Sequence, residues 1–275
     1  MCSSDLVLGN ATVKVGRSLI SGVTMGAETL KGDLLSVAVT GADLFIGTGA
    51  TFDATTGLVT LPAETSTTAV GFRVSGGTLN LGVFTSREKL VSGSYTALEA
   101  ANTLKYTGLK GSLGSARLQG VDAVKIVATR LTFQMNRTSA ADGVLMDWTQ
   151  TALAGTGVGL TPDDVPFQIG GTVGLSIADV VMGSATLDMT RGPVSGVVIP
   201  GSDVATQGTL LTLAVNQANL YIGNGATFDL DSKSATFGTV VLPASNDPTA
   251  VGFAVENGAF KIAVLTVGSG ATAKK

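Results

Sequence analysis

Histidine is missing from the chain, and its single cysteine stands at position 2. The sequence therefore has no zinc site built on Cys and His, no Ser-His-Asp or Cys-His catalytic set, and no histidine to hold a haem iron. Charged residues make up only 13% of the chain, and the net charge is −3. Because no basic surface is available to neutralise phosphates, we expect no nucleic-acid partner.

Long apolar runs are missing too. No stretch of 18 or more apolar residues occurs, so the sequence predicts no membrane-spanning helix and no membrane insertion. What the chain has instead is glycine, 37 residues of 275, nearly twice the usual share of about 7%. Dispersed Val, Leu and Ala complete a composition that favours tightly turning strands over amphipathic helices.

The first residues suggest an unnatural start. Residues 1–6, Met-Cys-Ser-Ser-Asp-Leu, match the translation of a sequencing-adapter tail, as in a fragment from metagenomic sequencing. We expect residues 1–8 to be such an artefact without fixed structure and the natural N-terminus to be missing. An export signal would then be missing with it, so its absence is uninformative. A flexible tail is expected at 267–275.

Internal repetition is the strongest signal in the sequence. Residues 42–53 return as residues 218–229 with nine of twelve positions identical, and Val-Gly-Phe at 70–72 returns at 251–253. A shorter match links residues 9–13, 114–118 and 183–187. These matches predict three tandem units at 9–113, 114–182 and 183–266. The first contains an insertion at 85–110, expected to be a short helix or a surface excursion.

Each unit is predicted to consist of short strands. In residues 35–39 and 42–46 apolar side chains alternate with a period of two, as on one face of a pleated strand. The dipeptides between such strands are Thr40-Gly41, Thr129-Arg130 and Asn216-Gln217. Thr129-Arg130 is a poor candidate for a two-residue hairpin, and all three suit a corner where the chain bends. We therefore predict an all-β fold, a repeat-built parallel β-helix or β-solenoid, with tandem Ig-like β-sandwiches as the alternative. Phe72, Phe167 and Phe253 recur at one unit position and are expected in the core.

A family resemblance rests on the pattern of the middle unit. Leu118-x-Gly-Val-Asp122 is followed by Val124-x-Ile-x-Ala128, Leu131-x-Phe133-x-Met-Asn136 and Leu145-Met-Asp-Trp148. This pattern resembles the tandem β repeats of very large bacterial secreted or surface proteins of adhesin type. The resemblance implies a spacer or surface-display role, a place for calcium and no known catalytic residues. The Gly-Gly-x-Gly-x-Asp motif of calcium-loaded haemolysin-type repeats is absent.

One pair of carboxylates is the candidate metal site. Asp229 and Asp231 are spaced in a loop as hard cations such as calcium prefer, and a solvated turn is the competing interpretation. No catalytic residue and no cofactor besides that calcium are predicted, so we expect no enzyme activity.

Three functions follow as hypotheses. The first is a structural repeat segment of a large extracellular or cell-surface bacterial protein, acting as stalk or adhesion scaffold. Its expected partners are the neighbouring repeats of the parent chain and, in addition, a surface glycan. The second is a carbohydrate-active β-helix that binds or cleaves a polysaccharide, and the third is a calcium-stiffened repeat module.

Overall fold

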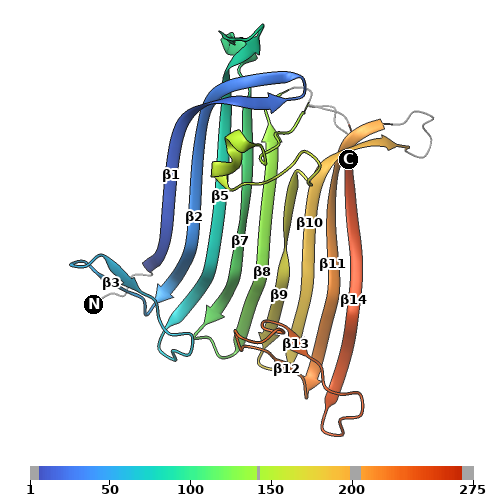
Figure 1. The fold of residues 1–275 in the computed structure, drawn as a ribbon. Helices are drawn as coiled ribbons and strands as arrows, with labels where there is room; N and C mark the ends of the chain where they lie inside the picture. Colours follow the sequence, from blue (N-terminus) through green and yellow to red (C-terminus); the bar gives the residue numbers. More distant parts are fainter. Residues whose placement is uncertain (1–5, 141–142, 199–205, 268–275) are drawn as a thin grey trace.

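The computed structural model describes residues 6–140, 143–198 and 206–267. The start and tail predicted to lack structure fall mostly outside these ranges, at 1–5 and 268–275. Nine long strands lie side by side in a single sheet, in the order in which they follow one another along the chain (Figure 1). They are β1 (Leu6–Met25), β2 (Glu28–Thr48), β5 (Val70–Val91), β7 (Lys105–Gln119), β8 (Val124–Thr138), β9 (Phe167–Ile177), β10 (Val181–Val197), β11 (Thr206–Asn224) and β14 (Val251–Val267). The predicted all-β class is confirmed.

Short elements occupy the connections between the long strands. They are β3 (Thr51–Asp53), β4 (Leu58–Thr60), β6 (Ser94–Ala97), β12 (Thr227–Phe228), β13 (Val240–Val241) and two 3₁₀ turns, η1 (Ala100–Asn102) and η2 (Thr151–Thr156). The predicted insertion at 85–110 consists of the end of β5, the paired strand β6, η1 and the start of β7. It extends the sheet by a hairpin and contains no α-helix.

The parallel β-helix is not confirmed, because every strand pairing among the described residues is antiparallel. The dipeptides predicted to form corners lie inside long strands instead. Gly41, Arg130 and Gln217 have φ of 59°, 53° and 51°, and the pairing register shifts at each of them. Each is a β-bulge, where an extra residue with positive φ interrupts the alternation without ending the strand.

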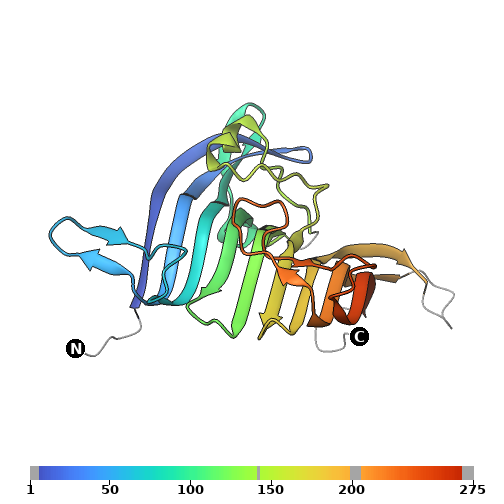
Figure 2. The ribbon, with the colours of Figure 1, turned by 90° about the horizontal axis from the view of Figure 1, so that it is seen from below.

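A second layer covers only part of the sheet, and this arrangement is compatible with a sandwich-like β fold. The nine strands form one continuous sheet, and connecting segments form a partial second layer on one side of it (Figures 1 and 2). We call the side under these segments the covered face and the other side the open face.

The sequence matches correspond to matched pairings. Leu34 pairs with Phe84 in β2 and β5, and Leu210 pairs with Leu265 at the equivalent positions of β11 and β14. Ile46 pairs with Phe72 just as Ile222 pairs with Phe253. Val13 pairs with Val39 just as Leu187 pairs with Val215, so the triplet β1–β2–β5 has the same internal register as the triplet β10–β11–β14. The unit boundaries at 9–113, 114–182 and 183–266 remain a prediction.

The larger core lies under the segment 139–166, which crosses the covered face of β1, β2, β5 and β7. Trp148 is 1% exposed and lies on the paired glycines Gly82 and Gly108, whose missing side chains leave a flat platform for the indole. Its Nε1–H donates to Asn136 Oδ1 at 3.1 Å, which satisfies the one polar group of the ring. The other buried members of this cluster are Val23, Leu30, Leu34, Phe84, Tyr106, Met146, Leu153, Val158 and Leu160.

A second, smaller core lies under the segment 225–250, at the opposite end of the strands (Figure 1). Phe228 and Phe237 pack there with residues from β8, β10 and β11. The Val240 amide donates to Ser184 Oγ at 3.1 Å, which ties the segment to β10. The full buried cluster is Val127, Met182, Tyr221, Ala226, Phe228, Phe237 and Val240.

The two halves of the third connecting segment, 49–69, lie in different places. Its second half is held on the covered face, where Arg117 donates to the Glu64 carbonyl at 3.0 Å and Gln119 to the Ala63 carbonyl at 2.6 Å. Its first half, the hairpin β3–β4, projects past β1 and away from the rest of the sheet (Figures 1 and 2). Phe52 and Leu58 on this hairpin are 55% and 65% exposed.

Candidate functional site

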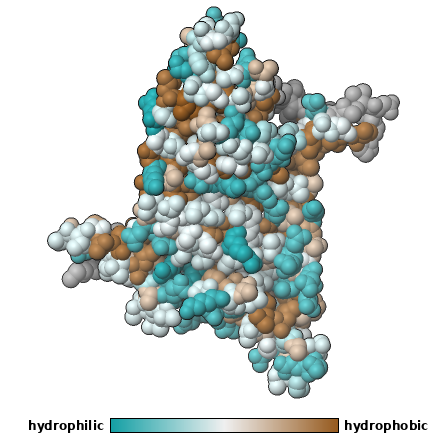
Figure 3. Space-filling model, in the orientation of Figure 1, coloured by the Kyte–Doolittle hydropathy of each residue, from teal (hydrophilic) through white to brown (hydrophobic). Residues whose placement is uncertain are grey.

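The middle of the covered face is polar. The pairings place Asn80, Lys110, Gln134 and Gln168 in one row across β5, β7, β8 and β9. The row lies between the two covering segments, and Figure 3 shows hydrophilic and neutral side chains across the middle of this face. Lys110 in this row is exposed, whereas Gln134 donates to the Val165 carbonyl at 3.1 Å and Asn80 lies beside Gly157, both in the segment 139–166.

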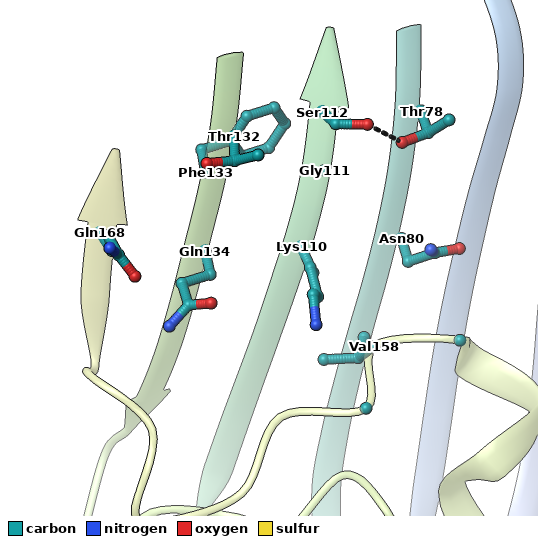
Figure 4. A pocket seen from close by; sticks show the side chains of 12 residues that line it. Thr78, Asn80, Lys110, Gly111, Ser112, Thr132, Phe133, Gln134, Val158 and Gln168 are labelled. Carbon is teal, nitrogen blue, oxygen red and sulfur yellow. Dashed lines mark hydrogen bonds between the residues drawn. The ribbon is translucent and has the colours of Figure 1, made fainter. Parts of the chain in front are cut away.

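Beside the segment 139–166 the polar row borders a hollow of about 340 Å³ (Figure 4). Val158 and the glycines next to it form one wall, and the strand residues form the floor. Thr78 and Ser112 join their hydroxyl groups at 2.8 Å in the next row of the floor. The Gln168 amide donates to Asp188 Oδ1 at 2.9 Å, which orients the amide at the edge of the hollow.

The chemistry of this hollow is that of a polar binding surface. Its polar lining consists of amides, hydroxyl groups and the Lys110 ammonium group, and none of its lining residues is a carboxylate. Hydrolysis of a glycosidic bond normally uses a pair of carboxyl groups across the bond. The hollow thus offers hydrogen bonds for a hydroxyl-rich ligand but no acid–base pair.

Asp164, in the segment beside the hollow, has a structural role. Asp164 accepts hydrogen bonds from the Thr161 amide at 2.7 Å and the Thr161 hydroxyl at 2.9 Å. The Thr161 amide is the main cause that lowers the pKa of Asp164, and the Lys110 charge adds a smaller effect. Asp164 is therefore ionised at neutral pH and fixes the turn that precedes β9.

The open face is apolar along its whole width. One row of directly paired residues crosses all nine strands and contains no polar side chain. Its members are Val13, Val39, Leu79, Gly111, Phe133, Ile169, Met189, Leu213 and Ile262. The Phe133 ring lies against Gly111 and fills the gap in the row.

The neighbouring row has one charge, that of Arg191. Its members are Val15, Val37, Leu81, Leu109, Met135, Phe167, Arg191, Leu211 and Val264. Both buried clusters lie on the covered face, so within the described chain nothing covers these two rows. Val15 is 68% exposed, Ile169 43% and Ile262 51%.

The expectation that Phe72, Phe167 and Phe253 lie in the core is wrong, because none of them belongs to either buried cluster and Phe253 is 61% exposed. Phe253 points to the open face, and its strand β14 has a neighbour on one side only. Phe72 and Phe167 are half-buried because strands flank them on both sides. The recurrence marks a shared position on the open face.

Asp229 and Asp231 each organise the turn in which they stand. Asp229 accepts the Asp231 amide at 2.9 Å and the Thr236 hydroxyl at 2.6 Å, and Asp231 accepts the Lys233 amide at 2.9 Å. Hydrogen bonds from the side chains of Ser234 and Thr236 lower the pKa of Asp229. Across the residues that the structure describes, no three Asp, Glu or Cys side chains are grouped to hold a metal ion. Calcium at this pair remains a prediction.

No family model, curated protein or solved structure matches the chain. In the described part of the chain, none of the helices is long and apolar enough to cross a membrane. The two faces of the sheet are thus the main indications of function.

Proposed function

We propose that the chain is a structural module of a large extracellular bacterial protein, without enzyme activity, which works by associating through the open face of its sheet. One observation supports this most: an apolar row that crosses nine strands with nothing packed on it. Soluble proteins rarely expose contiguous apolar surface of this extent unless it binds something.

The size of the open face suits a stable interface. Nine strands about 4.8 Å apart give a width of roughly 40 Å, and the apolar positions extend over roughly 35 Å along the strands. The face therefore offers on the order of 1,000 Å², against about 800 Å² per partner in a typical specific complex.

We infer that the occupant is the open face of a second copy. Two such faces are apolar across their middle rows, and sheets pack face to face about 10 Å apart with their side chains interdigitated. Stacking two sheets completes a sandwich whose outer sides are the polar covered faces. A stalk or adhesion scaffold built this way gains stiffness without a catalytic site.

The test uses neighbouring residues of β9 that point to opposite faces. Ile169→Lys places a charge in the middle of the open face, and Gln168→Lys places the same charge in the polar row of the covered face. Sedimentation velocity over a hundredfold range of concentration measures the mass of each variant. We expect the unmodified chain and Gln168→Lys to form dimers, and Ile169→Lys to remain monomeric at least tenfold higher in concentration.

Two outcomes would contradict the proposal: a chain that stays monomeric at every concentration, or equal association of the two lysine variants. Circular dichroism of both variants checks that each keeps its strands. Flotation with lipid vesicles tests the other apolar occupant, and binding of the open face to lipid in place of a second copy would overturn the stacked dimer.

The polar hollow favours a second candidate function, the binding of a polysaccharide. The amides of Asn80, Gln134 and Gln168, with the hydroxyl groups of Thr78 and Ser112, present donors and acceptors at one side of the sheet, as sugar hydroxyl groups require. A glycan array with the unmodified chain and with Gln134→Ala tests this function. Specific binding that the variant loses would support it, and no binding to any glycan would contradict it.

Calcium stiffening is the third candidate, and its test is a thermal melt with calcium and with EDTA. A ligand that binds only the folded state raises its stability. A midpoint that rises with calcium and no longer rises in Asp229→Asn would support a calcium module, and an unchanged midpoint would exclude it.

A further inference from the structure

The hollow beside the segment 139–166 is one end of a longer polar trough. A second hollow, of about 400 Å³, lies further along the covered face on β8, β9, β10 and β11. Thr132 and Gln168 line both hollows, so the two adjoin. The trough crosses the sheet from β5 to β11, and strands about 4.8 Å apart give it a length of roughly 24 Å. An extended chain molecule suits this shape better than a single small one.

Two β-bulges place long polar side chains in the trough. Arg130 and Gln217 have φ of 53° and 51° inside long strands, and both line the second hollow. At the bulge of β2, which lies outside the trough, the residue with positive φ is Gly41. Positive φ strains a residue that has a Cβ, and glycine would avoid this strain. Because bulges re-aim side chains and strained residues gather at binding sites, two retained side chains indicate a role in the trough.

The other non-glycine residues with positive φ have ordinary explanations. Ser92 and the pair Ala178-Asp179 stand in turns, and Asn257 is of a residue type that adopts this conformation readily. Among the described residues, the long strands therefore hold only two residues with positive φ that are neither glycine nor asparagine. Both of them line the trough.

A chain of hydrogen bonds joins the two strained side chains across four strands. Arg130 Nη2 donates to Thr172 Oγ1 at 3.1 Å, and the Thr172 and Thr186 hydroxyl groups lie 3.2 Å apart. The Thr186 hydroxyl donates to Gln217 Oε1 at 3.3 Å. Because a hydroxyl group has a single hydrogen, all three bonds run in one direction, from Arg130 to Gln217. The groups left over at the two ends are donors, the other N–H groups of the guanidinium and the amide N–H groups of Gln217.

The positive charges of the trough have no carboxylate of their own. Lys110 and Arg130 are both exposed, and none of the ion pairs in the described part of the chain involves either of them. The carboxylates in this region already have donors, since Asp188 accepts the Gln168 amide and Asp164 accepts the amide of its own turn. Two cations therefore remain for the anionic groups of a ligand.

The amides of the trough supply the opposite chemistry. Gln134 and Gln168 use their Nε2 groups as donors, to the Val165 carbonyl at 3.1 Å and to Asp188 Oδ1 at 2.9 Å. Their Oε1 atoms are left to accept hydrogen bonds, which sugar hydroxyl groups donate. Figure 4 shows both amides beside the Lys110 ammonium group on the floor of the first hollow. A ligand that matches the trough thus combines hydroxyl groups with acidic groups.

We propose that the trough binds an acidic polysaccharide, with Lys110 and Arg130 on its carboxylate or sulfate groups and the glutamine amides on its hydroxyl groups. This inference rests on the second candidate function, the binding of a polysaccharide, and is independent of stacking through the open face. It gives that function a ligand class. It also makes the positive φ of Arg130 a cost of binding rather than a requirement of folding.

Affinity electrophoresis with matched probes tests the ligand class. Polygalacturonate carries a carboxylate on each sugar, and its fully methyl-esterified form has the same chain without the charge. Dextran sulfate and unmodified dextran form the corresponding pair for sulfate, and monomeric galacturonate shows whether a polymer is required. We expect at least tenfold tighter binding of one acidic polymer than of its uncharged counterpart and of the monomer.

The outcomes separate this inference from the function on which it rests. Equal binding of the charged and uncharged polymers would overturn the acidic ligand and leave polysaccharide binding in place. No binding of any probe would overturn both. Neither result depends on whether the chain dimerises through its open face.

Variants at the bulge separate a binding role from a structural one. Arg130→Gly removes the charge and relieves the strain of positive φ, so affinity should fall at least tenfold while the thermal midpoint stays unchanged or rises. Lys110→Gln should lower affinity several-fold. Lys261→Gln is the control, because it removes a charge from the covered face of β14, outside the trough. Unchanged affinity in Arg130→Gly, or an equal loss in Lys261→Gln, would contradict the site.

Discussion

The segments that follow β2 and β11 begin with nearly the same sequence and end in different places. Both leave their strands through glycines of similar conformation, Gly47 with φ 148° and Gly223 with φ 143°. A few residues later Phe228 is 9% exposed against the sheet, whereas its counterpart Phe52 is 55% exposed on a projecting hairpin. The difference arises from the strands that precede each segment, because eight strands of the sheet precede one and two precede the other. Whether a connecting segment packs on the sheet is thus decided by the strands that lie beside it more than by its own sequence.

Trp148→Ala should cause the largest loss of stability, because Trp148 is the largest buried side chain that the segment 139–166 packs on the sheet. Truncating a fully buried Trp leaves a cavity over Gly82 and Gly108, and we expect a loss of about 3–5 kcal/mol in the free energy of unfolding. Urea denaturation measures it. Trp148→Phe keeps most of the ring but leaves Asn136 Oδ1 without its donor, so a smaller loss of about 1–3 kcal/mol is expected. Equal losses would show that the ring does not support the segment.

Phe228→Ala and Phe52→Ala compare the two matched segments directly. Phe228 packs in the second core, so its truncation should cost about 2–4 kcal/mol. Phe52 contacts solvent in an isolated chain, and its truncation should change the stability by less than about 0.5 kcal/mol. Both values come from urea denaturation at a concentration where the chain is monomeric. A large loss for Phe52→Ala would mean that the hairpin is already packed within one molecule.

Gly47→Ala and Gly223→Ala should destabilise the chain to a similar extent. In each case φ is positive, and the new Cβ would collide with the carbonyl oxygen of Val70 or Val251 on the next strand. We expect each to cost more than about 1 kcal/mol. Gly183→Ala is the control, because its Cβ would make ordinary contacts with Asn219 O at 3.7 Å and Leu220 Cδ1 at 3.9 Å, and its φ is not positive. A harmless Gly47→Ala beside a harmful Gly223→Ala would contradict the equivalence of the two strand ends.

Acid should loosen the second covering segment slightly. The hydrogen bonds from Ser234 and Thr236 lower the pKa of Asp229 in the folded chain. A carboxylate with a lowered folded pKa stabilises the fold above its unfolded pKa of about 3.9, and this contribution disappears as the pH falls through the folded value. The thermal midpoint of the unmodified chain should therefore fall more between pH 5 and about pH 2 than that of Asp229→Asn. Parallel pH profiles would show that these hydrogen bonds do not stabilise the turn.

Much of the strand content was predictable from the sequence, and the connections were not. The period-two alternation at 35–39 and 42–46 is real, but both stretches belong to β2. The alternation changes phase at Gly41 because a bulge adds one residue, and a corner would change it in the same way. A positive φ at Arg130 within a strand is a property of the pairing on both sides, which local sequence does not report.

The two faces were harder still to predict. Asn80, Lys110, Gln134 and Gln168 are scattered over almost ninety positions and become neighbours only through the register of four strands. For the same reason the apolar row through Ile169 is visible only once nine strands are aligned. Asp229 and Asp231 were found from their spacing alone, and in the structure each accepts a backbone hydrogen bond that stabilises its own turn.

The most direct measurement is methyl NMR of isoleucine-labelled chain with a soluble paramagnetic agent, recorded at low and at high concentration. Ile169 and Ile262 lie on the open face and are 43% and 51% exposed in one molecule. We expect both methyl groups to be strongly relaxed by the agent in the dilute monomer and protected from it, about as well as buried methyl groups, once the chain has associated. Methyl groups that stay fully accessible to the agent in the associated state would contradict an open face that works by stacking.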